Sequence, residues 1–262
     1  NFYIHRILKK IMEMVVEERI EKQQFRIGNA TTLELFVAPG RIFQPNQTSE
    51  AVYTSVEVYE GDIGIEIGAG IGPGTILLAQ RKIGYLYTVE IIPEQCGIQK
   101  LNLELHGLRE KVSVLQGSLF EPIKRLYPEV KADFIVSDVS GMNDVGVELG
   151  WYPPNIPRGG EDGAENIIPF LEQAKHFLNT RNERARVYFP IVVNFSDGKK
   201  IIDKARENYS TLEKIAERRI PLKQEQLTII ENSKHAIFEP IERKGSRGLW
   251  KVEIYRVMQP IY

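Results

Sequence analysis

Apolar runs alternate with helical patterns along most of the chain, from about residue 61 to residue 258. Runs of apolar and β-branched residues, typical of buried strands, occupy residues 63–67, 85–89, 112–115, 134–136, 185–193, 211–222 and 250–258. Apolar residues recur every three or four positions, as is typical of helices, in residues 74–81, 93–106, 164–178 and 199–209. Strands that alternate with helices predict an α/β fold around a parallel sheet.

The end of the chain departs from this alternation. No long helical pattern separates residues 211–222 from residues 250–258, which indicates an antiparallel pair at one edge of the sheet. The pattern as a whole predicts a Rossmann-like, doubly wound, mostly parallel seven-stranded sheet with an antiparallel edge, forming a catalytic domain over residues 51–262. In such sheets, ligands bind beyond the carboxyl ends of the strands.

Residues 1–50 are expected to form an N-terminal helical and hairpin extension. Within a helical pattern over residues 4–25, an apolar stripe is formed by Ile4, Ile7, Leu8, Ile11, Met14, Val15 and Ile20. Residues 33–38 and 41–43 flank the turn-favouring pair Pro39-Gly40, which predicts a hairpin. Thr48 or Ser49 is expected to cap a helix that runs to about Tyr59. The stripe fits a cap packed on the main domain; a lid over substrate or a homodimer contact is the alternative.

Composition narrows the class of protein. Of the 262 residues, 42% are apolar and 26% are charged, which is ordinary for a globular protein. The net charge of −1 gives no global positive field that would attract nucleic acid. The single cysteine, Cys96, excludes an internal disulfide, and no apolar run is long enough to span a membrane. Without a signal-peptide pattern, we expect a cytoplasmic protein. The four histidines are scattered, so no metal site is predicted.

A glycine-rich turn follows the first strand pattern of the catalytic domain. The run Glu66-Ile67-Gly68-Ala69-Gly70-Ile71-Gly72 leads directly into a helix. Glycines allow a tight turn and close approach of the backbone to a ligand, and the helix presents its N–H groups to that ligand. The dinucleotide fingerprint needs Gly-x-Gly-x-x-Gly or Ala. Counted from Gly68 and from Gly70, its last position falls on Pro73 and on Thr75, so that fingerprint is disfavoured.

Two further strand ends carry candidate ligand residues. Glu90 closes the next strand pattern, just before Ile91, and its carboxylate can accept hydrogen bonds from both hydroxyls of a ribose. Nicotinamide enzymes share this feature, and a solvated glutamate at a strand end is the alternative. Gln116-Gly117-Ser118-Leu119-Phe120 ends the third strand pattern, where Ser118 can bond to an adenine amino group and Leu119 can pack on the ring.

The glycine turn with its preceding acid, Glu90 and the Ser118 turn together resemble the class I S-adenosylmethionine-dependent methyltransferases. The resemblance implies S-adenosylmethionine as cofactor. It implies that the cofactor is bound by Glu66, Gly68, Ala69, Gly70, Gly72, Glu90, Ile91, Ser118, Leu119 and Asp138.

Within that superfamily, residues 35–258 resemble the branch of protein-glutamine N5-methyltransferases that act on peptide release factors. The similarity is carried by Phe43-Gln44-Pro45, by Thr48-Ser49-Glu50 and by Gly159-Gly160-Glu161-Asp162-Gly163, which is similar to the family's Gly-Gly-x-Asp-Gly. The family's Asn-Pro-Pro-Tyr, which holds the amide nitrogen to be methylated, is missing. Asp138-Val139-Ser140-Gly141 stands in its place, which argues against amide chemistry and for a different acceptor.

Asp138 is the candidate catalytic residue because it follows the fourth strand pattern, where an acceptor atom would meet the methyl group. A carboxylate there can take a proton from a hydroxyl or ammonium group, or orient a cationic substrate. Binding of the methionine amino group is the alternative. Trp151 and Tyr152 lie on a proline-rich loop, where they fit either the stacking of a flat substrate or a small satellite core. The substrate candidates are Pro45, Thr48, Ser140, Trp151 and Tyr152.

The sequence therefore favours methyl transfer from S-adenosylmethionine to a small molecule, either amino-acid-like or a biosynthetic intermediate. A protein or RNA acceptor is the first alternative. A non-methylating displacement on the sulfonium is the second, because the altered segment at Asp138 leaves room for it. A non-catalytic partner subunit and a nicotinamide dehydrogenase are the remaining interpretations, and Pro73 disfavours the latter.

Overall fold

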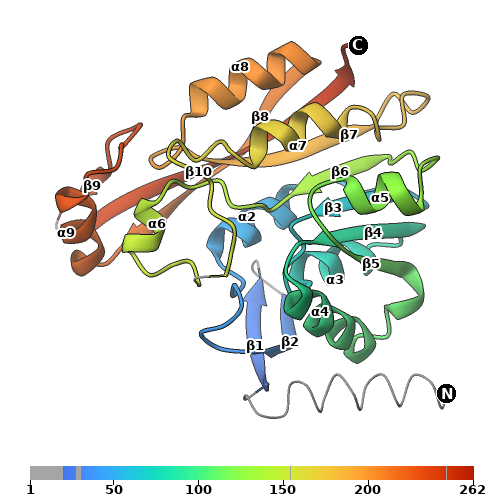
Figure 1. Ribbon diagram of the computed structural model, residues 1–262, viewed down its shortest axis with the longest axis horizontal. Helices are drawn as coiled ribbons and strands as arrows, with labels where there is room; N and C mark the ends of the chain where they lie inside the picture. The colour runs from blue at the N-terminus through green and yellow to red at the C-terminus, as the bar shows by residue number, and fades with distance from the viewer. Residues whose placement is uncertain (1–19, 28–30, 154, 246) are drawn as a thin grey trace.

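The strands of the catalytic domain lie side by side in one sheet, in the order β5-β4-β3-β6-β7-β10-β8, with a short strand β9 paired to β10 (Figure 1). The computed structural model describes residues 20–27, 31–153, 155–245 and 247–262. The strands of this sheet are β3 (Ile63–Ile67), β4 (Tyr85–Glu90), β5 (Val112–Gln116), β6 (Phe134–Ser137), β7 (Arg186–Val192), β8 (Tyr209–Leu222), β9 (Glu242–Lys244) and β10 (Arg247–Pro260).

The pairing directions confirm the predicted Rossmann-like α/β class. Strands β5, β4, β3, β6 and β7 are parallel, whereas β10 is antiparallel to both β7 and β8. The predicted seven strands form the continuous path of the sheet, and β9 is an addition. The strand order reverses between β3 and β6, which creates the crevice at the carboxyl ends where open α/β sheets bind ligands.

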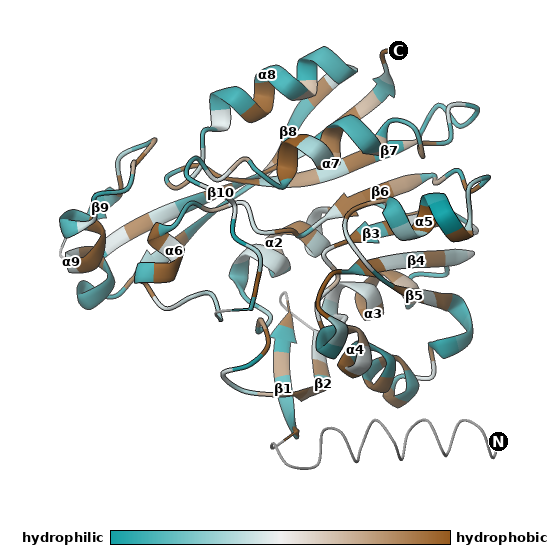
Figure 2. Ribbon diagram, in the orientation of Figure 1, coloured by the Kyte–Doolittle hydropathy of each residue, from teal (hydrophilic) through white to brown (hydrophobic). Residues whose placement is uncertain are grey.

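Helices cover both faces of the sheet (Figure 1). They are α2 (Gln47–Ser55), α3 (Pro73–Ala79), α4 (Pro93–Leu105), α5 (Glu121–Leu126), α6 (Val145–Glu148), α7 (Ile167–Ala174), α8 (Gly198–Asn208) and α9 (Gln224–Asn232), with a short 3-10 helix η1 (Arg109–Lys111). Because side chains alternate along a strand, Phe134 and Val136 join the core under α2, α3 and α4. Ile135 joins the core under α5, α7 and α8. Strand β6 is accordingly mostly brown in Figure 2, while much of α8 is teal.

The N-terminal expectations are partly wrong. Residues 21–25, included in the predicted helical pattern, belong to strand β1 (Glu21–Ile27), which pairs with β2 (Thr31–Val37). The chain does turn at Pro39-Gly40, but residues 41–43 form no strand. The buried side chains of β2 alternate, and this strand period fits a hairpin laid on α4. The apolar stripe from Ile4 to Val15 lies outside the described residues, so the cap, lid and homodimer interpretations stay predictions.

Helix α2 begins and ends earlier than predicted. The Asn46 side chain, and not that of Thr48 or Ser49, caps it by accepting from the N–H groups of Thr48 and Ser49 at 2.8 and 3.0 Å. Ser49 is thereby placed inside the helix, with its side chain buried. The helices α5, α6 and α9 and the strand β9 were not predicted, because each is short or follows no clear apolar period.

Asn102 of α4 links the β1–β2 hairpin to the glycine turn. Its Oδ1 accepts from Phe36 N at 2.7 Å, and its Nδ2 donates to Ile71 O at 2.8 Å. The hairpin is thus tied to the same helix that supports the glycine turn. A domain boundary near residue 50 stays a prediction. Among the described residues, no helix combines the length and apolarity needed to cross a bilayer.

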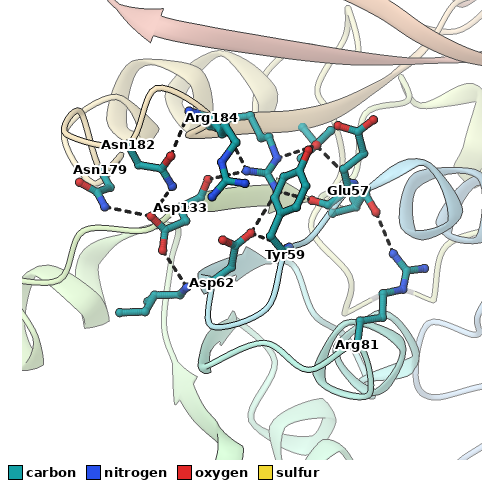
Figure 3. A network of polar contacts seen from close by, with 12 residues as sticks. Glu57, Tyr59, Asp62, Arg81, Asp133, Asn179, Asn182 and Arg184 are labelled. Carbon is teal, nitrogen blue, oxygen red and sulfur yellow. Dashed lines mark hydrogen bonds and ion pairs between the residues drawn. The ribbon is translucent and has the colours of Figure 1, made fainter.

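A buried ion pair lies at the amino-terminal ends of the strands, opposite the ligand crevice (Figure 3). Arg186 Nη2 lies 3.0 Å from Asp62 Oδ2, and the two side chains are only 2% and 5% exposed. The same guanidinium donates to Glu57 O at 2.8 Å and lies 4.7 Å from the centre of the Tyr59 ring. Because these contacts join β7 to the segment before β3, they hold the amino-terminal ends of the strands in register.

We expect Arg186→Met to lower the free energy of unfolding by about 3–5 kcal/mol, because it leaves the Asp62 carboxylate buried without its counter-charge. Urea unfolding followed by circular dichroism measures this. Lys199→Ala, which removes an exposed lysine paired with Asp203, is the control and should leave the unfolding curve unchanged. A loss below about 1 kcal/mol in Arg186→Met would show that the pair does not stabilise the fold.

Candidate active site

A cavity of about 870 Å³ opens at the carboxyl ends of the parallel strands. Its volume is near the top of the range of about 300–1,000 Å³ for ligand pockets, so it has room for a cofactor and a second molecule. The sequence-predicted site residues that line it are Pro45, Thr48, Gly68, Ala69, Gly70, Glu90, Ile91, Ser118, Leu119, Asp138, Ser140, Trp151 and Tyr152. Glu66 and Gly72 are not among its lining residues.

The glycine turn lies between β3 and α3 and is held close to two neighbouring strands. Gly68 has a φ of 79°, a left-handed value that favours glycine. A Cβ atom there would lie 3.0 Å from Val139 N, so a side chain would push the turn away from the segment after β6. Gly68 N also donates to Val89 O at 2.9 Å. The glycine is required by the close approach of β3, β4 and β6 around the cavity.

Glu90 places a carboxylate at the cavity wall, at the end of β4. Its Oε2 accepts from Gly70 N at 2.8 Å, and its Oε1 accepts from Ile92 N at 2.8 Å and from Gln95 Nε2 at 3.1 Å. Burial raises its pKa, and these hydrogen bonds lower it in part. A carboxylate has about four acceptor positions, so one remains for a ligand hydroxyl beyond these three donors.

Apolar residues flank this carboxylate on either side. The side chain of Ile91 lines the cavity and is 42% exposed, which is unusual for isoleucine. Leu119 lines it as well and has a φ of 45°, a strained value for a residue with a Cβ atom. This part of the cavity therefore fits the nucleoside part of S-adenosylmethionine. The Glu90 carboxylate can bind a ribose hydroxyl, and the apolar side chains and the Ser118 turn can contact the adenine ring.

Asp138 follows β6, and its N–H donates to Ile67 O at 3.0 Å. Its carboxyl lines the cavity, and burial raises its pKa to about 7, although a hydrogen bond from the Ser49 hydroxyl of α2 lowers the pKa in part. Glu90 raises it further through like charge. A carboxyl with a pKa near neutrality can accept and release a proton under physiological conditions. Asp138 is therefore suited to proton transfer at this position.

Glu66 points to the opposite side of β3, into the protein interior. It is fully buried, and its Oε2 accepts from Thr75 Oγ1 at 2.6 Å. Gln99 Nε2 in turn donates to Thr75 Oγ1 at 2.8 Å. Burial raises the pKa of Glu66 to about 8, and hydrogen bonds from Thr75 and Tyr53 offset this only in part. Glu66, the acid of the glycine motif, thus stabilises the turn from the protein interior through its hydrogen bond with Thr75 of α3.

We expect Glu66→Gln to change how stability depends on pH. The pKa of Glu66 is raised from 4.5 to about 8 by folding, so the folded state binds this proton more tightly and stability is lost as pH rises through that window. One such group contributes about 1.4 kcal/mol per pH unit between its two pKa values. Urea unfolding at pH 5 to 8 should therefore show a shallower decline in the variant.

Glu110→Gln, an exposed position on η1, is the control and should keep the wild-type decline. Glu90 and Asp138 have raised pKa values too, so a smaller decline remains in Glu66→Gln. An unchanged decline in Glu66→Gln would contradict the assignment of a buried, protonated Glu66.

Aromatic rings form the wall beyond Asp138. The rings of Phe43 and Tyr152 are stacked with centroids 5.8 Å apart, and the rings of Trp151 and Trp250 are 5.4 Å apart. All four residues line the cavity. Trp151 also packs edge-on against Phe195 in the core. The two sequence interpretations of this loop are therefore compatible, because the same rings pack on the core and face the cavity.

Several lining residues were not predicted, among them Gln95, Asn166, Lys223, Gln226 and Trp250. The Gln95 side chain bridges two groups: its Nε2 donates to the Glu90 carboxylate, and its Oε1 accepts from Phe43 N at 3.1 Å. Asn166 Nδ2 donates to Ser140 O at 3.0 Å and thereby positions the segment after Asp138. Asn166 lies three residues after Gly163, so the glycine-rich segment could have pointed to it. No local pattern marked the others.

Comparison with known proteins supports the resemblance. No family model matches the chain. The chain is similar to the release factor glutamine methyltransferase of Aquifex aeolicus (strain VF5), with 26% identity over 148 residues that cover 52% of this chain and 51% of that protein. The chain thus spans about half the length of this curated relative.

Solved structures share the fold. The precorrin-6y C5,15-methyltransferase of Geobacter metallireducens GS-15 superposes with a TM-score of 0.53 at 12% identity, covering 83% of this chain and 90% of that chain. The 16S rRNA N2 G1207 methyltransferase of T. thermophilus, in complex with AdoMet and guanosine, superposes with a TM-score of 0.58 at 16% identity, covering 92% of this chain and 51% of that chain. At these identities the likeness establishes the fold alone, and it agrees with the predicted class I methyltransferase architecture.

Proposed function

We propose that this protein is an S-adenosylmethionine-dependent methyltransferase. One observation carries the proposal: Glu90, the glycine turn and Asp138 line the same cavity, at the point where the strand order reverses. The carboxylate and apolar walls at one end of that cavity suit a nucleoside, and an ionisable carboxyl lies beside them. The similarity to a release factor glutamine methyltransferase supports the same class of reaction.

Bound S-adenosylmethionine supplies an electrophilic methyl group carried on a sulfonium. The residues of this chain orient the acceptor and remove its proton. Asp138, in its ionised form, takes the proton from the acceptor's hydroxyl or ammonium group, and Ser49 holds its carboxyl in place. The rings of Tyr152 and Trp151 exclude water from the acceptor and fix its orientation, and alignment provides most of what methyl transfer requires.

A small-molecule acceptor is supported by the charges around the cavity. Nucleic acid needs several free cations, because each phosphate contact uses one. The arginines on neighbouring elements are instead paired with acids: Arg218 lies 3.0 Å from Glu50, and Arg219 lies 2.6 Å from Glu242. The lining beyond Asp138 is mainly aromatic and aliphatic, which suits a compact ligand.

Isothermal titration calorimetry with S-adenosylmethionine and S-adenosylhomocysteine tests the cofactor, and we expect one site per chain for both. Binding of neither would refute the proposal. The acceptor class is tested by incubating the protein with methyl-labelled S-adenosylmethionine and a cell lysate, then separating the products by size. Label in the small-molecule fraction supports the acceptor that we propose. Label in protein or RNA would contradict a small-molecule acceptor and identify a macromolecular one. Label only in fragments of the cofactor would indicate a non-methylating reaction.

A further inference from the structure

We propose that Lys223 receives an anionic group of the acceptor, so that the acceptor is a flat aromatic acid with an ionisable hydroxyl or amino group at its other end. The inference rests on the proposed function and adds the chemical class of the substrate. It is carried by the placement of a single cation in a cavity whose other charges are acidic and whose walls are aromatic.

The charges of the cavity are separated along it. Among its described lining residues, Glu90 and Asp138 are the acids, and Lys223 is the only lysine, arginine or histidine. Glu90 lies at the end of β4 and Asp138 directly follows β6, whereas Lys223 lies between β8 and α9 and lines the cavity from there. We call the part of the cavity between Asp138 and Lys223 the acceptor chamber. An acceptor with an anionic group is therefore attracted to the Lys223 end and repelled from the Asp138 end, which orients it.

Lys223 is available for a ligand. Its side chain is exposed, and within the described ranges it forms no ion pair with an acidic residue. Basic residues near it on the adjoining strands behave differently: Arg219 is paired with Glu242, and Lys251 lies 3.1 Å from Glu239. An unpaired cation at the opening of an apolar chamber is suited to a ligand carboxylate, with which it can form a charge-assisted hydrogen bond.

The segment that carries Lys223 is anchored to the loop of Asp138. Asn143, five residues after Asp138, donates through Nδ2 to Ala236 O at 2.8 Å. Asn194, at the end of β7, donates through Nδ2 to Glu239 O and Pro240 O, both at 3.0 Å. Both asparagine side chains are buried. These contacts tie the segment between β8 and β10, which carries Lys223, to the loop after Asp138 and to the end of β7.

The walls between the two ends favour a planar ligand. Tyr152 stacks with Phe43 at an interplanar angle of 21°, and the facing rings of Trp151 and Trp250 are inclined by 34°. Flat rings bury a planar ligand with little loss of conformational entropy, and ring-on-ring contacts add to the hydrophobic gain. A hydroxyl on such a ligand then lies at the Asp138 end, where its proton can pass to the carboxylate as the oxygen takes the methyl group.

The test measures charge preference with matched probes. 4-Hydroxybenzoate and 6-hydroxy-2-naphthoate, with their neutral amides, are titrated into protein saturated with S-adenosylhomocysteine. We expect at least one acid to bind about 10-fold more tightly than its amide, the effect of one charge-assisted hydrogen bond. Lys223→Gln should abolish this preference. The matched control, Lys234→Gln, removes an exposed lysine of the same segment that does not line the cavity, and it should keep the preference.

Each outcome is decisive for one of the two proposals. If S-adenosylhomocysteine binds but neither acid is preferred over its amide, the inference on Lys223 is refuted and the proposed function stands. Equal loss of the preference in both variants would assign it to general surface charge and would also refute the inference. Failure of S-adenosylhomocysteine to bind the wild-type protein would refute the proposed function itself. Circular dichroism of Lys223→Gln verifies that the variant is folded.

Discussion

Glu90→Ala is expected to weaken the binding of S-adenosylhomocysteine about 100-fold. In the proposed complex, the remaining acceptor position of the Glu90 carboxylate takes a hydrogen bond from a ribose hydroxyl, and a bond to a charged group contributes about 1.5–3 kcal/mol. The loss of that one bond accounts for the expected change in Kd, which titration calorimetry measures.

The same substitution leaves the N–H groups of Gly70 and Ile92 without their acceptor, so part of the effect can arise from the turn itself. Urea unfolding of the ligand-free variant separates the two causes. Glu110→Ala, on the exposed 3-10 helix, is the control and should bind as the wild type does. If Glu90→Ala lost stability but kept its affinity within about twofold, Glu90 would hold the turn and not the ligand.

Asp138→Asn is expected to lower the rate of methyl transfer by about 10²- to 10⁴-fold, the usual contribution of a general base. The amide keeps the shape of the side chain but cannot take the acceptor's proton. Affinity for S-adenosylhomocysteine should change little, because Glu90 and the glycine turn are intact. The rate is measured as label transferred to the acceptor fraction identified with labelled S-adenosylmethionine, and affinity by calorimetry.

The pH profile adds a second measurement. The ionised form of Asp138 is the active base, and its pKa is about 7, so the wild-type rate should rise with pH through neutrality and then level off. Ser49→Ala removes a hydrogen bond that lowers this pKa, so its profile should shift to higher pH. If Asp138→Asn kept the wild-type rate but lost affinity for the cofactor, the carboxylate would be a binding group and not a base.

The central strands and the glycine turn could be predicted because the residues that determine them are close together in the sequence. Residues 63–67 form a strand as predicted, since a short β-branched run ending in a glycine turn has few alternatives. The positions of Glu90 and Ser118 follow from the same logic, because the carboxyl ends of parallel strands meet at one edge of the sheet. In the N-terminal hairpin, residues 33–38 were predicted close to β2, but the partner strand was wrong. Residues 21–25 fit a helical period and lie in β1 only through pairing with β2.

The sequence by itself determined the class of fold, the order of its central elements and most of the residues at the end of the cavity that we propose for the cofactor, although Glu66 and Gly72 do not line it. Tertiary structure decided what those residues face. Glu66 belongs to the motif by spacing, yet it points into the core because Thr75 and Tyr53 arrive there from other elements. Lys223 and Trp250 line the cavity only because β10 inserts between β7 and β8, which brings together segments that are far apart in the chain. No local pattern encodes such a meeting, because it depends on which surfaces pack against each other once the sheet is complete.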